Sequence, residues 1–282
     1  MKGTLYLVPT PIGNLADMTY RGVEVLRNAD AIACEDTRRT ALLCTHYNIH
    51  TPLISYHEHN KEKAVPALIA RLEAGESVAV VSDAGMPAIA DPGSDLVARW
   101  LAQDGEVTAL PGANAGLTAL IASGLSAQEF HFIGFLPRTA AKRDEMLHRQ
   151  AEDTATQILY EAPHRLAETL QAVQAMWGDR RAVLARELTK KFETYYRGRL
   201  GELLTTDTVQ SPRGEYVVLV EGSMPAEETP LAPSEWPHAV RSEMVRGKSY
   251  KEACRKVAGL AGVSRRDVYG YCLDKMETRE DI

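Results

Sequence analysis

Short apolar runs alternate with helical patterns through the first 225 residues of this 282-residue chain, and this alternation limits the possible folds more than any other feature. Five apolar runs in the first half are expected to form strands: Leu5–Val8, Ala31–Cys34, Leu53–Tyr56, Val78–Val81 and Val107–Leu110. Helical patterns lie near residues 19–28, 60–74, 94–103 and 114–123. Between residues 60 and 74, four apolar residues recur at the spacing of one helix face: Val65, Leu68, Ile69 and Leu72. The alternation predicts an α/β fold whose sheet has parallel segments.

The same pattern restarts after residue 127. Further strands are expected at Phe130–Phe135, Gln157–Tyr160, Ala182–Ala185, Thr194–Arg197 and Tyr216–Val220, with helices near 139–152 and 164–176. We therefore expect two α/β lobes, residues 1–118 and 119–225, joined near residues 112–127. A chain of this length can bury a large core without a metal or a disulfide.

Residues 226–282 are expected to form a linker and a small helical appendage. Four prolines and three glutamates between Pro225 and Pro237 are typical of a linker. Ser249 and Glu252 then have capping-box spacing and predict a helix through Val257, which Gly259–Gly262 should break. Ser264 is placed to cap a second helix. The arrangement resembles a helix-turn-helix, although any helical hairpin would have a similar pattern.

Charge is distributed unevenly along the chain. The net charge is −6, yet Arg241 to Met276 holds nine basic and four acidic residues, a net +5. The final six residues contribute −2, so the first 240 residues carry −9. A basic appendage on an acidic body suggests a module that binds a polyanion; the alternative is an ordinary solvated helix face.

Several enzyme classes are disfavoured by missing motifs. No two glycines are separated by a single residue, which excludes the dinucleotide-binding G-x-G-x-x-G motif. Gly247-Lys248-Ser249 resembles the end of a phosphate-binding P-loop, but Ser242 stands where that motif needs glycine. His57 and His59 would face the same way on a strand, but no third ligand accompanies them, so we expect no metal.

The chain is expected to be cytoplasmic and to have no membrane span. Its four cysteines show no paired spacing and are expected to be reduced thiols. The N-terminus lacks the apolar stretch of a signal peptide, and no apolar run is long enough to cross a membrane.

Three loops rich in glycine, proline and small residues follow expected strands of the first lobe: Pro9–Asn14, Ser82–Gly93 and Pro111–Ala115. Ligands of α/β sheets bind beyond the carboxyl ends of the strands, and small residues there let a ligand approach the backbone. One such loop would be ordinary turn chemistry. Three at successive strand ends predict a shared pocket.

The motifs in these loops resemble those of the tetrapyrrole methylase superfamily, within it the branch that methylates ribosomal RNA. They are P-T-P-I-G-N-L-x-D from Pro9, A-x-x-C-E-D-T-R-R-T from Ala31, S-D-A-G-M-P-x-I-x-D-P-G from Ser82 and L-P-G-A-N-A from Leu110. Y-E-A-P-H-R from Tyr160, R-E-L-T-K-K-F-E from Arg186 and G-E-Y from Gly214 add to the resemblance, which covers the whole chain.

This resemblance implies S-adenosyl-L-methionine bound in a cleft between two α/β lobes. It also implies 2′-O-ribose methylation of the P-site cytidine of 16S rRNA within the assembled 30S subunit, by a homodimer. The cofactor contacts expected from it are Pro9, Asp83, Gly85, Met86, Pro87, Ala88, Ile89, Pro111, Gly112, Ala113, Asn114, Leu136, Ala162, Leu188 and Glu215. Met86 stands where the tetrapyrrole enzymes have the aspartate of a Gly-Asp-Pro loop, and Asp83 could supply a substitute charge.

Two polar clusters after expected strands supply candidate catalytic groups. We expect Glu187 or Asp36 to act as base or orienting group, and Lys190 to stabilise the developing oxyanion. Phosphate contacts are expected from two groups of cations: Arg38, Arg39 and Arg165 near the cleft, and Arg255, Lys256, Arg265 and Arg266 in the appendage. For each of these residues the alternative is an ordinary surface ion pair.

Two other readings compete with this one. A methylase of a tetrapyrrole or of a protein, such as diphthine synthase, would share the fold, but Met86 and the basic appendage argue against it. The other is a non-catalytic factor that binds RNA or assists ribosome assembly.

Overall fold

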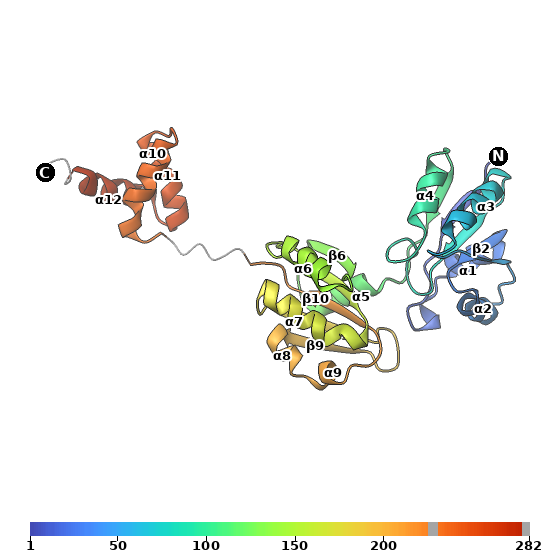
Figure 1. The fold of residues 1–282 in the computed structure, drawn as a ribbon. Helices are drawn as coiled ribbons and strands as arrows, with labels where there is room; N and C mark the ends of the chain where they lie inside the picture. Colours follow the sequence, from blue (N-terminus) through green and yellow to red (C-terminus); the bar gives the residue numbers. More distant parts are fainter. Residues whose placement is uncertain (225–230, 278–282) are drawn as a thin grey trace. The chain divides into compact units, whose positions relative to one another are not determined.

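The chain forms two compact units, Met1–Ser223 and Met224–Ile282. A computed structural model describes residues 1–224 and 231–277, and Figure 1 follows the chain through them. The first unit holds two five-stranded sheets flanked by helices, and the second is helical. The predicted α/β class of the body is therefore confirmed.

The first sheet is parallel throughout, in the order β3-β2-β4-β1-β5. Its strands are β1 (Thr4–Leu7), β2 (Ala31–Cys34), β3 (Leu53–Ser55), β4 (Val78–Val81) and β5 (Glu106–Ala109). The helices that connect them are α1 (Tyr20–Asn28), α2 (Thr37–His46), α3 (Lys61–Glu73) and α4 (Ser94–Leu101), with a short 3₁₀ helix, η1, at Leu15–Asp17. Because β2 and β4 are buried along their whole length, they show continuous apolar runs rather than alternation.

Helices cover both faces of this sheet. On one face, α3 and α4 pack through Leu68, Leu72 and Trp100. On the other, Leu26 of α1 and Cys44 of α2 join Ile32 and Ala79 of the sheet. The four apolar residues of the predicted stripe on α3 are all buried, which confirms that prediction.

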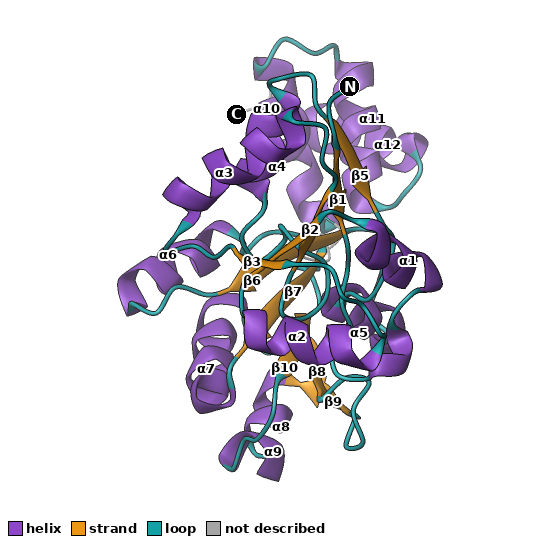
Figure 2. Ribbon diagram, turned by 90° about the vertical axis from the view of Figure 1, so that its right-hand side faces the viewer, coloured by secondary structure: helices purple, strands orange, loops and turns teal. Residues whose placement is uncertain are grey.

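The second sheet is mixed, in the order β6-β7-β10-β8-β9. Its strands are β6 (Phe130–Phe135), β7 (Thr156–Glu161), β8 (Arg181–Arg186), β9 (Thr194–Arg199) and β10 (Tyr216–Val220). Only β6 and β7 are parallel; the other pairs are antiparallel. Its helices are α5 (Ala115–Ser123), α6 (Ala140–Arg149), η2 (Pro163–Arg165), α7 (Leu166–Trp177), α8 (Leu200–Leu204) and α9 (Asp207–Gln210). Figure 2 shows the strands in orange among these helices.

Helix α5 belongs to the second sheet. Its Ala119 and Leu120 pack against Ile158, Val183 and Leu219 on one face, while α6 to α9 cover the other. The expected boundary between residues 118 and 119 falls inside this helix, whereas its packing assigns the whole helix to the second lobe.

The second unit contains η3 (Pro233–Glu235) and three helices, α10 (Trp236–Val245), α11 (Tyr250–Ala261) and α12 (Arg265–Glu277). The capping box of Ser249 and Glu252 is present, and Ser264 accepts a hydrogen bond from the backbone N–H of Asp267, so both predicted helix starts are confirmed. Helix α11 continues through Gly259 and ends at Ala261 with Gly262 as its C-cap, so the expected break falls at the end of the Gly259–Gly262 stretch. One expectation was wrong: the end of the expected linker forms η3 and the start of α10. Pro237 is tolerated because it lies in the first turn, where no backbone N–H is needed.

Candidate active site

A cavity of about 670 Å³ lies within the first unit, at the carboxyl ends of the strands of the first sheet. Glu35 follows β2, the segment from Asp83 to Asp91 follows β4, and Asn114 follows β5. The second lobe closes the cavity with Tyr160 and its neighbours at the end of β7, and with residues near Glu215. The volume is that of a typical small-molecule site, and it lies where open α/β sheets bind ligands.

A smaller cavity of about 310 Å³ adjoins the first. Five residues line both: Ile12, Arg39, Asp83, Ala84 and Glu215. The pocket is therefore extended, with room for a second group beside the main ligand.

Backbone hydrogen bonds hold the first two loops of the pocket together. Thr10 and Gly85 exchange N–H···O bonds of 2.9 Å in both directions. The Thr10 hydroxyl donates to the carbonyl of Ser82 at 3.0 Å, and the Ser82 hydroxyl donates to the carbonyl of Gly85 at 2.9 Å. Because these bonds are internal, the loops are ordered before any ligand binds.

The third loop fits closely under the first. A Cβ atom on Gly112 would lie 2.6 Å from the Cβ of Pro9, so only glycine allows this contact. Asn114 caps α5 by accepting from the N–H of Leu117 at 2.9 Å. The N–H of Gly116 donates to the Tyr160 hydroxyl at 3.1 Å, which ties the start of α5 to β7.

About half of the expected cofactor contacts line the large cavity. These residues are Asp83, Gly85, Met86, Ile89, Asn114, Ala162, Leu188 and Glu215. The others do not line it: Pro9, Pro87, Ala88, Pro111, Gly112, Ala113 and Leu136. Among these, Pro9 packs against Gly112, and Leu136 is 2% exposed in the core of the second lobe. Their positions fit a supporting role around the pocket.

Carboxylates dominate the electrostatics of the large cavity. Asp83 accepts the backbone N–H of Asp36 at 3.1 Å and lies 3.3 Å from Nη1 of Arg39. Asp91 has no hydrogen-bond or ion-pair partner within residues 1–224 and 231–277. Burial, with the negative charges of Glu35 and Asp83, raises the pKa of Asp91 to about 6.

Glu187 and Lys190 form a polar cluster beside the cavity, in a turn with unusual backbone. Glu187 and Thr189 have φ values of 52° and 64°, which non-glycine residues rarely adopt. Lys190 Nζ donates to Glu187 Oε1 at 3.0 Å and to Glu215 Oε2 at 2.8 Å. Glu187 Oε1 also accepts the N–H of Glu215 at 3.0 Å, and Gly214 leaves no room beside it for a Cβ.

These contacts shift the pKa values of the pair in opposite directions. Although burial alone would raise it, the pKa of Glu187 lies below its usual value because Lys190 and the N–H of Glu215 donate to the carboxylate. Burial would lower the pKa of Lys190, but the two carboxylates raise it. Both groups are charged at neutral pH, and Lys190 lines the smaller cavity.

The cations expected near the cleft differ in their accessibility. Arg38, at the start of α2, is 89% exposed and pairs with Asp36, which caps that helix. Hydrogen bonds from Arg38 lower the pKa of Asp36 to about 2. Arg39 lines both cavities. By contrast, Arg165 is mostly buried and donates to the carbonyls of Leu136 and Pro137, so its contacts support a structural role in the second lobe.

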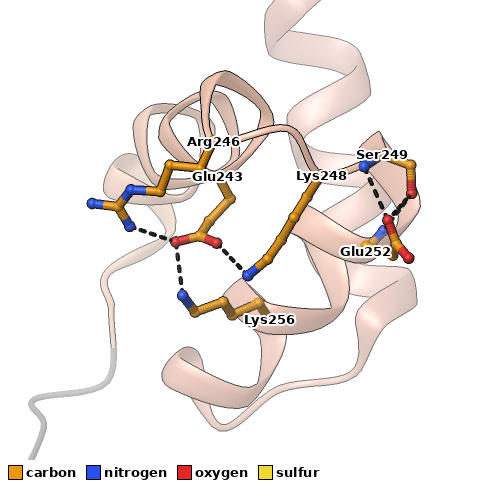
Figure 3. Close-up of polar contacts among 6 residues, drawn as sticks. All are labelled: Glu243, Arg246, Lys248, Ser249, Glu252 and Lys256. Carbon is orange, nitrogen blue, oxygen red and sulfur yellow. Dashed lines mark hydrogen bonds and ion pairs between the residues drawn. The ribbon is translucent and has the colours of Figure 1, made fainter.

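The second unit presents the other expected cations. Arg255, Arg265 and Arg266 are exposed and form no ion pair within its described residues. Lys256 lies 2.8 Å from Glu243, a carboxylate whose side chain is only 7% exposed. Glu243 also pairs with Arg246 and Lys248, at 2.7 and 2.6 Å (Figure 3). The buried carboxylate therefore fixes three cations around one point.

Some cavity residues were not among the expected contacts. They include Ile12, Asp91, Phe135, Tyr160 and His164. Asp91 lies in the motif that begins at Ser82, and Tyr160 and His164 belong to Y-E-A-P-H-R, so sequence motifs could have pointed to these three residues. Nothing in the sequence pattern distinguishes Phe135 from an ordinary strand residue.

No helix among the described residues is long and apolar enough to cross a membrane. The same residues contain no group of three or more histidine, cysteine or acidic side chains that could hold a metal ion.

The chain is similar in sequence or in fold to several known proteins. A curated relative from Bacillus subtilis, named ribosomal RNA small subunit methyltransferase I, is 47% identical over 272 residues, which cover 95% of this chain and 93% of that protein. A crystal structure of diphthine synthase shares the fold, with a TM-score of 0.59 and 17% identity over 78% of this chain and 90% of that one. A uroporphyrin-III C-methyl transferase from Thermus thermophilus, complexed with S-adenyl homocysteine, has a TM-score of 0.55 and 17% identity over 78% of this chain and 92% of that one.

A family model extends the comparison across most of the first unit. The model described as Tetrapyrrole (Corrin/Porphyrin) Methylases matches residues 4–204, which include nine of the ten strands and most of the cavity. Together with 47% identity over nearly the whole length of a curated relative, this match shows the family. The chain belongs to the tetrapyrrole (corrin/porphyrin) methylase family.

Proposed function

We propose that this protein transfers the methyl group of S-adenosyl-L-methionine to a ribose 2′-hydroxyl, that of the P-site cytidine of 16S rRNA in the 30S subunit. The observation that carries the proposal is a preformed cavity inside a fold whose 47% identical relative is named a ribosomal RNA methyltransferase. A cytoplasmic location follows from such a substrate.

The residues around the cavity fit this cofactor. Gly85 and Ala84 let a ligand approach the backbone, and Asn114 presents its side chain at the same edge. Asp83 provides negative charge that suits a sulfonium cation. When bound, the cofactor supplies an electrophilic methyl group, and the chain's own residues align the acceptor with it.

The polar cluster around Lys190 supports an orienting role. Glu187 is held by two donors and has a lowered pKa, so of its two predicted roles its contacts fit that of an orienting group. Lys190 remains the candidate for stabilising the acceptor oxygen, because it lines the smaller cavity. Asp36 caps α2 and holds Arg38, and this contact presents the arginine at the surface.

Contacts with the RNA backbone are proposed for exposed cations in both units. Arg39 lines both cavities, and Arg38, the residue before it, is 89% exposed. In the second unit Arg255, Lys256, Arg265 and Arg266 are exposed on helices of a basic segment. Phosphate contacts of this kind add affinity without reading sequence, which suits docking on a structured RNA.

We also propose that the protein is a homodimer. Several large apolar side chains on α5 and β6 are exposed, including Ile121 at 79%, Phe135 at 57% and Leu117 at 44%. An apolar surface of this kind is typical of a protein interface. Light scattering on the purified chain, with Ile121→Glu as the disruptive variant, tests this part of the proposal.

The test of the activity is methyl transfer from tritiated cofactor to three acceptors: 30S subunits, free 16S rRNA and uroporphyrinogen. We expect transfer to 30S subunits, with label in a ribose-methylated cytidine after nuclease digestion and mass spectrometry. Transfer to uroporphyrinogen alone would favour a tetrapyrrole methylase. Calorimetric binding of the cofactor without transfer to any acceptor would favour an assembly factor.

A further inference from the structure

The acidic groups near the cavity differ in what they contact. Glu187, Asp36 and Asp83 each accept at least one hydrogen bond from the protein and lie near a basic side chain. Asp91 and Glu35 have no such partner within the described residues, and both line the large cavity; Glu35 is exposed, whereas Asp91 is partly buried. Its carboxylate oxygens therefore keep their lone pairs for a ligand.

The loop that carries Asp91 is fixed on both sides. Ala88 has a φ of 65°, and a Cβ atom on Gly93, whose φ is 149°, would lie 2.8 Å from the Cβ of Ala88. On the far side, the carbonyl of Gly93 accepts the N–H of Val97 in the first turn of α4. The short segment between these points carries Asp91 with little freedom to turn it away from the cavity.

The charged groups that face Asp91 come from several elements. Glu35 after β2 and Asp83 after β4 are negative, and the Tyr160 hydroxyl of β7 is affected by the Asp91 charge in turn. Arg39 of α2 also lines the cavity, and its cation already pairs with Asp83. Burial and the two neighbouring carboxylates raise the pKa of Asp91 to about 6, while the pKa values of Asp36 and Glu187 are lowered.

A proton acceptor works best when its pKa is near the working pH and when it is not already hydrogen-bonded to a cation. The pKa values of Asp36 and Glu187 are lowered, and both carboxylates already accept a hydrogen bond from a cation. We propose that Asp91 is a catalytic residue that accepts the proton of the acceptor hydroxyl during methyl transfer; this inference rests on the ribose methylation proposed above.

The step balances as follows. The acceptor O–H bond breaks and its proton goes to a carboxylate oxygen of Asp91. The acceptor oxygen forms a bond to the methyl carbon, and the carbon–sulfur bond of the sulfonium breaks with its electron pair left on sulfur, which becomes a neutral thioether. The Asp91 carboxyl then releases its proton to water.

The test compares full-length wild type with Asp91→Asn and Asp91→Glu, using 30S subunits and saturating cofactor. Asp95→Asn is the matched control, because Asp95 lies on the neighbouring helix, pairs with Arg99 and does not line either cavity. We expect kcat to fall by about 10²–10⁴-fold in Asp91→Asn, with partial recovery in Asp91→Glu. We also expect kcat/KM of wild type to decrease below about pH 6, and this acid limb to be absent from the residual activity of Asp91→Asn.

Two measurements without turnover accompany the kinetics. Calorimetry should give cofactor dissociation constants within about threefold of wild type for Asp91→Asn, since the proton acceptor acts on the other substrate. Carbon NMR of labelled aspartate should show one carboxyl that titrates near pH 6 in wild type and is missing in Asp91→Asn.

The outcomes separate the two proposals. Ribose methylation by wild type together with unchanged kcat in Asp91→Asn would overturn the role of Asp91 and leave the proposed function intact. Loss of cofactor affinity with kcat retained at saturation would overturn it as well. Absence of ribose methylation by wild type on both RNA substrates would overturn the proposed function and the inference together.

Discussion

Replacing Asp91 by asparagine should stabilise the folded protein at neutral pH. The folded state raises the pKa of this carboxyl from 3.8 to about 6, so its ionised form is disfavoured on folding. Such a shift corresponds to about 3 kcal/mol at a pH above 6. Because part of the side chain still reaches water, screening reduces this to about 1.5 kcal/mol. Asparagine cannot ionise and removes that cost.

The size of the stability gain changes with pH in a defined way. Well below pH 3.8 the carboxyl is protonated in both states, and the substitution should have no electrostatic effect. The cost of ionisation grows as pH rises toward about 6 and is constant above it. The gain in stability should therefore be largest at pH 7.5 and about half as large at pH 5.

Urea unfolding at pH 7.5 and pH 5 measures this difference, with Asp95→Asn as the control that should change stability little. A gain of about 1.5 kcal/mol corresponds to a rise in Tm of roughly 3–6 °C for a unit of this size. A stability loss at pH 7.5, or a gain that is equal at both pH values, would refute the reasoning. The expected pairing of higher stability with lower activity is common at functional sites.

Further predictions concern packing, charge and RNA contact. Gly3→Ala should destabilise the first unit by about 3 kcal/mol in urea unfolding, because the new Cβ would lie 1.8 Å from the carbonyl oxygen of Glu76. Gly259→Ala should instead stabilise α11 by about 0.5–1 kcal/mol, because no atom lies within 4 Å of the new Cβ and alanine favours a helix more than glycine does. Glu243→Gln should reduce amide-exchange protection of α10 at pH 7. Three cations hold the Glu243 pKa at about 2, so this stabilisation is present above pH 4.5 and lost as pH falls toward 2, where the variant should match wild type. The double variant Arg265→Ala/Arg266→Ala should weaken binding to 30S subunits and lower its salt slope by about 2 without changing cofactor affinity; an unchanged slope would exclude these residues from the RNA contact.

Strands with continuous or strongly apolar patterns could be predicted closely from the sequence. Ala31–Cys34 and Val78–Val81 match the observed strands, because full burial on both faces demands such runs. The start of helix α10 could not be predicted from its proline-rich composition, which is typical of a linker, although Pro237 occupies a position where helices accept proline. Helix α2 was not predicted either: its start is dominated by charged residues, Asp36 to Arg39, and the helix buries only a few residues, among them Leu43 and Cys44.

The positions of the pocket loops were predictable, but the partners of their side chains were not. Strand ends and small residues locate the loops. Glu187 accepts hydrogen bonds from Lys190 and from the N–H of Glu215 because the backbone at Glu187 and Thr189 is left-handed. No residue pattern predicts a left-handed backbone at residues other than glycine. Asp91 belongs to the motif that begins at Ser82, but the motif does not show that its carboxylate has no hydrogen-bond partner among the described residues.

The strand order also governs how this protein can fold while it is being synthesised. Strand β1 is made first but pairs with β4 and β5, so the first sheet is complete only once residue 109 has left the ribosome. Strand β10 is made last and joins β7 to β8, so the second sheet stays in two halves until Val220 emerges. At 5–20 residues per second, the 34 residues from Arg186 to Val220 take about 2–7 s to make. During that time the inner edges of β7 and β8 are open to pairing with other chains, and any truncation before Tyr216 makes that state permanent.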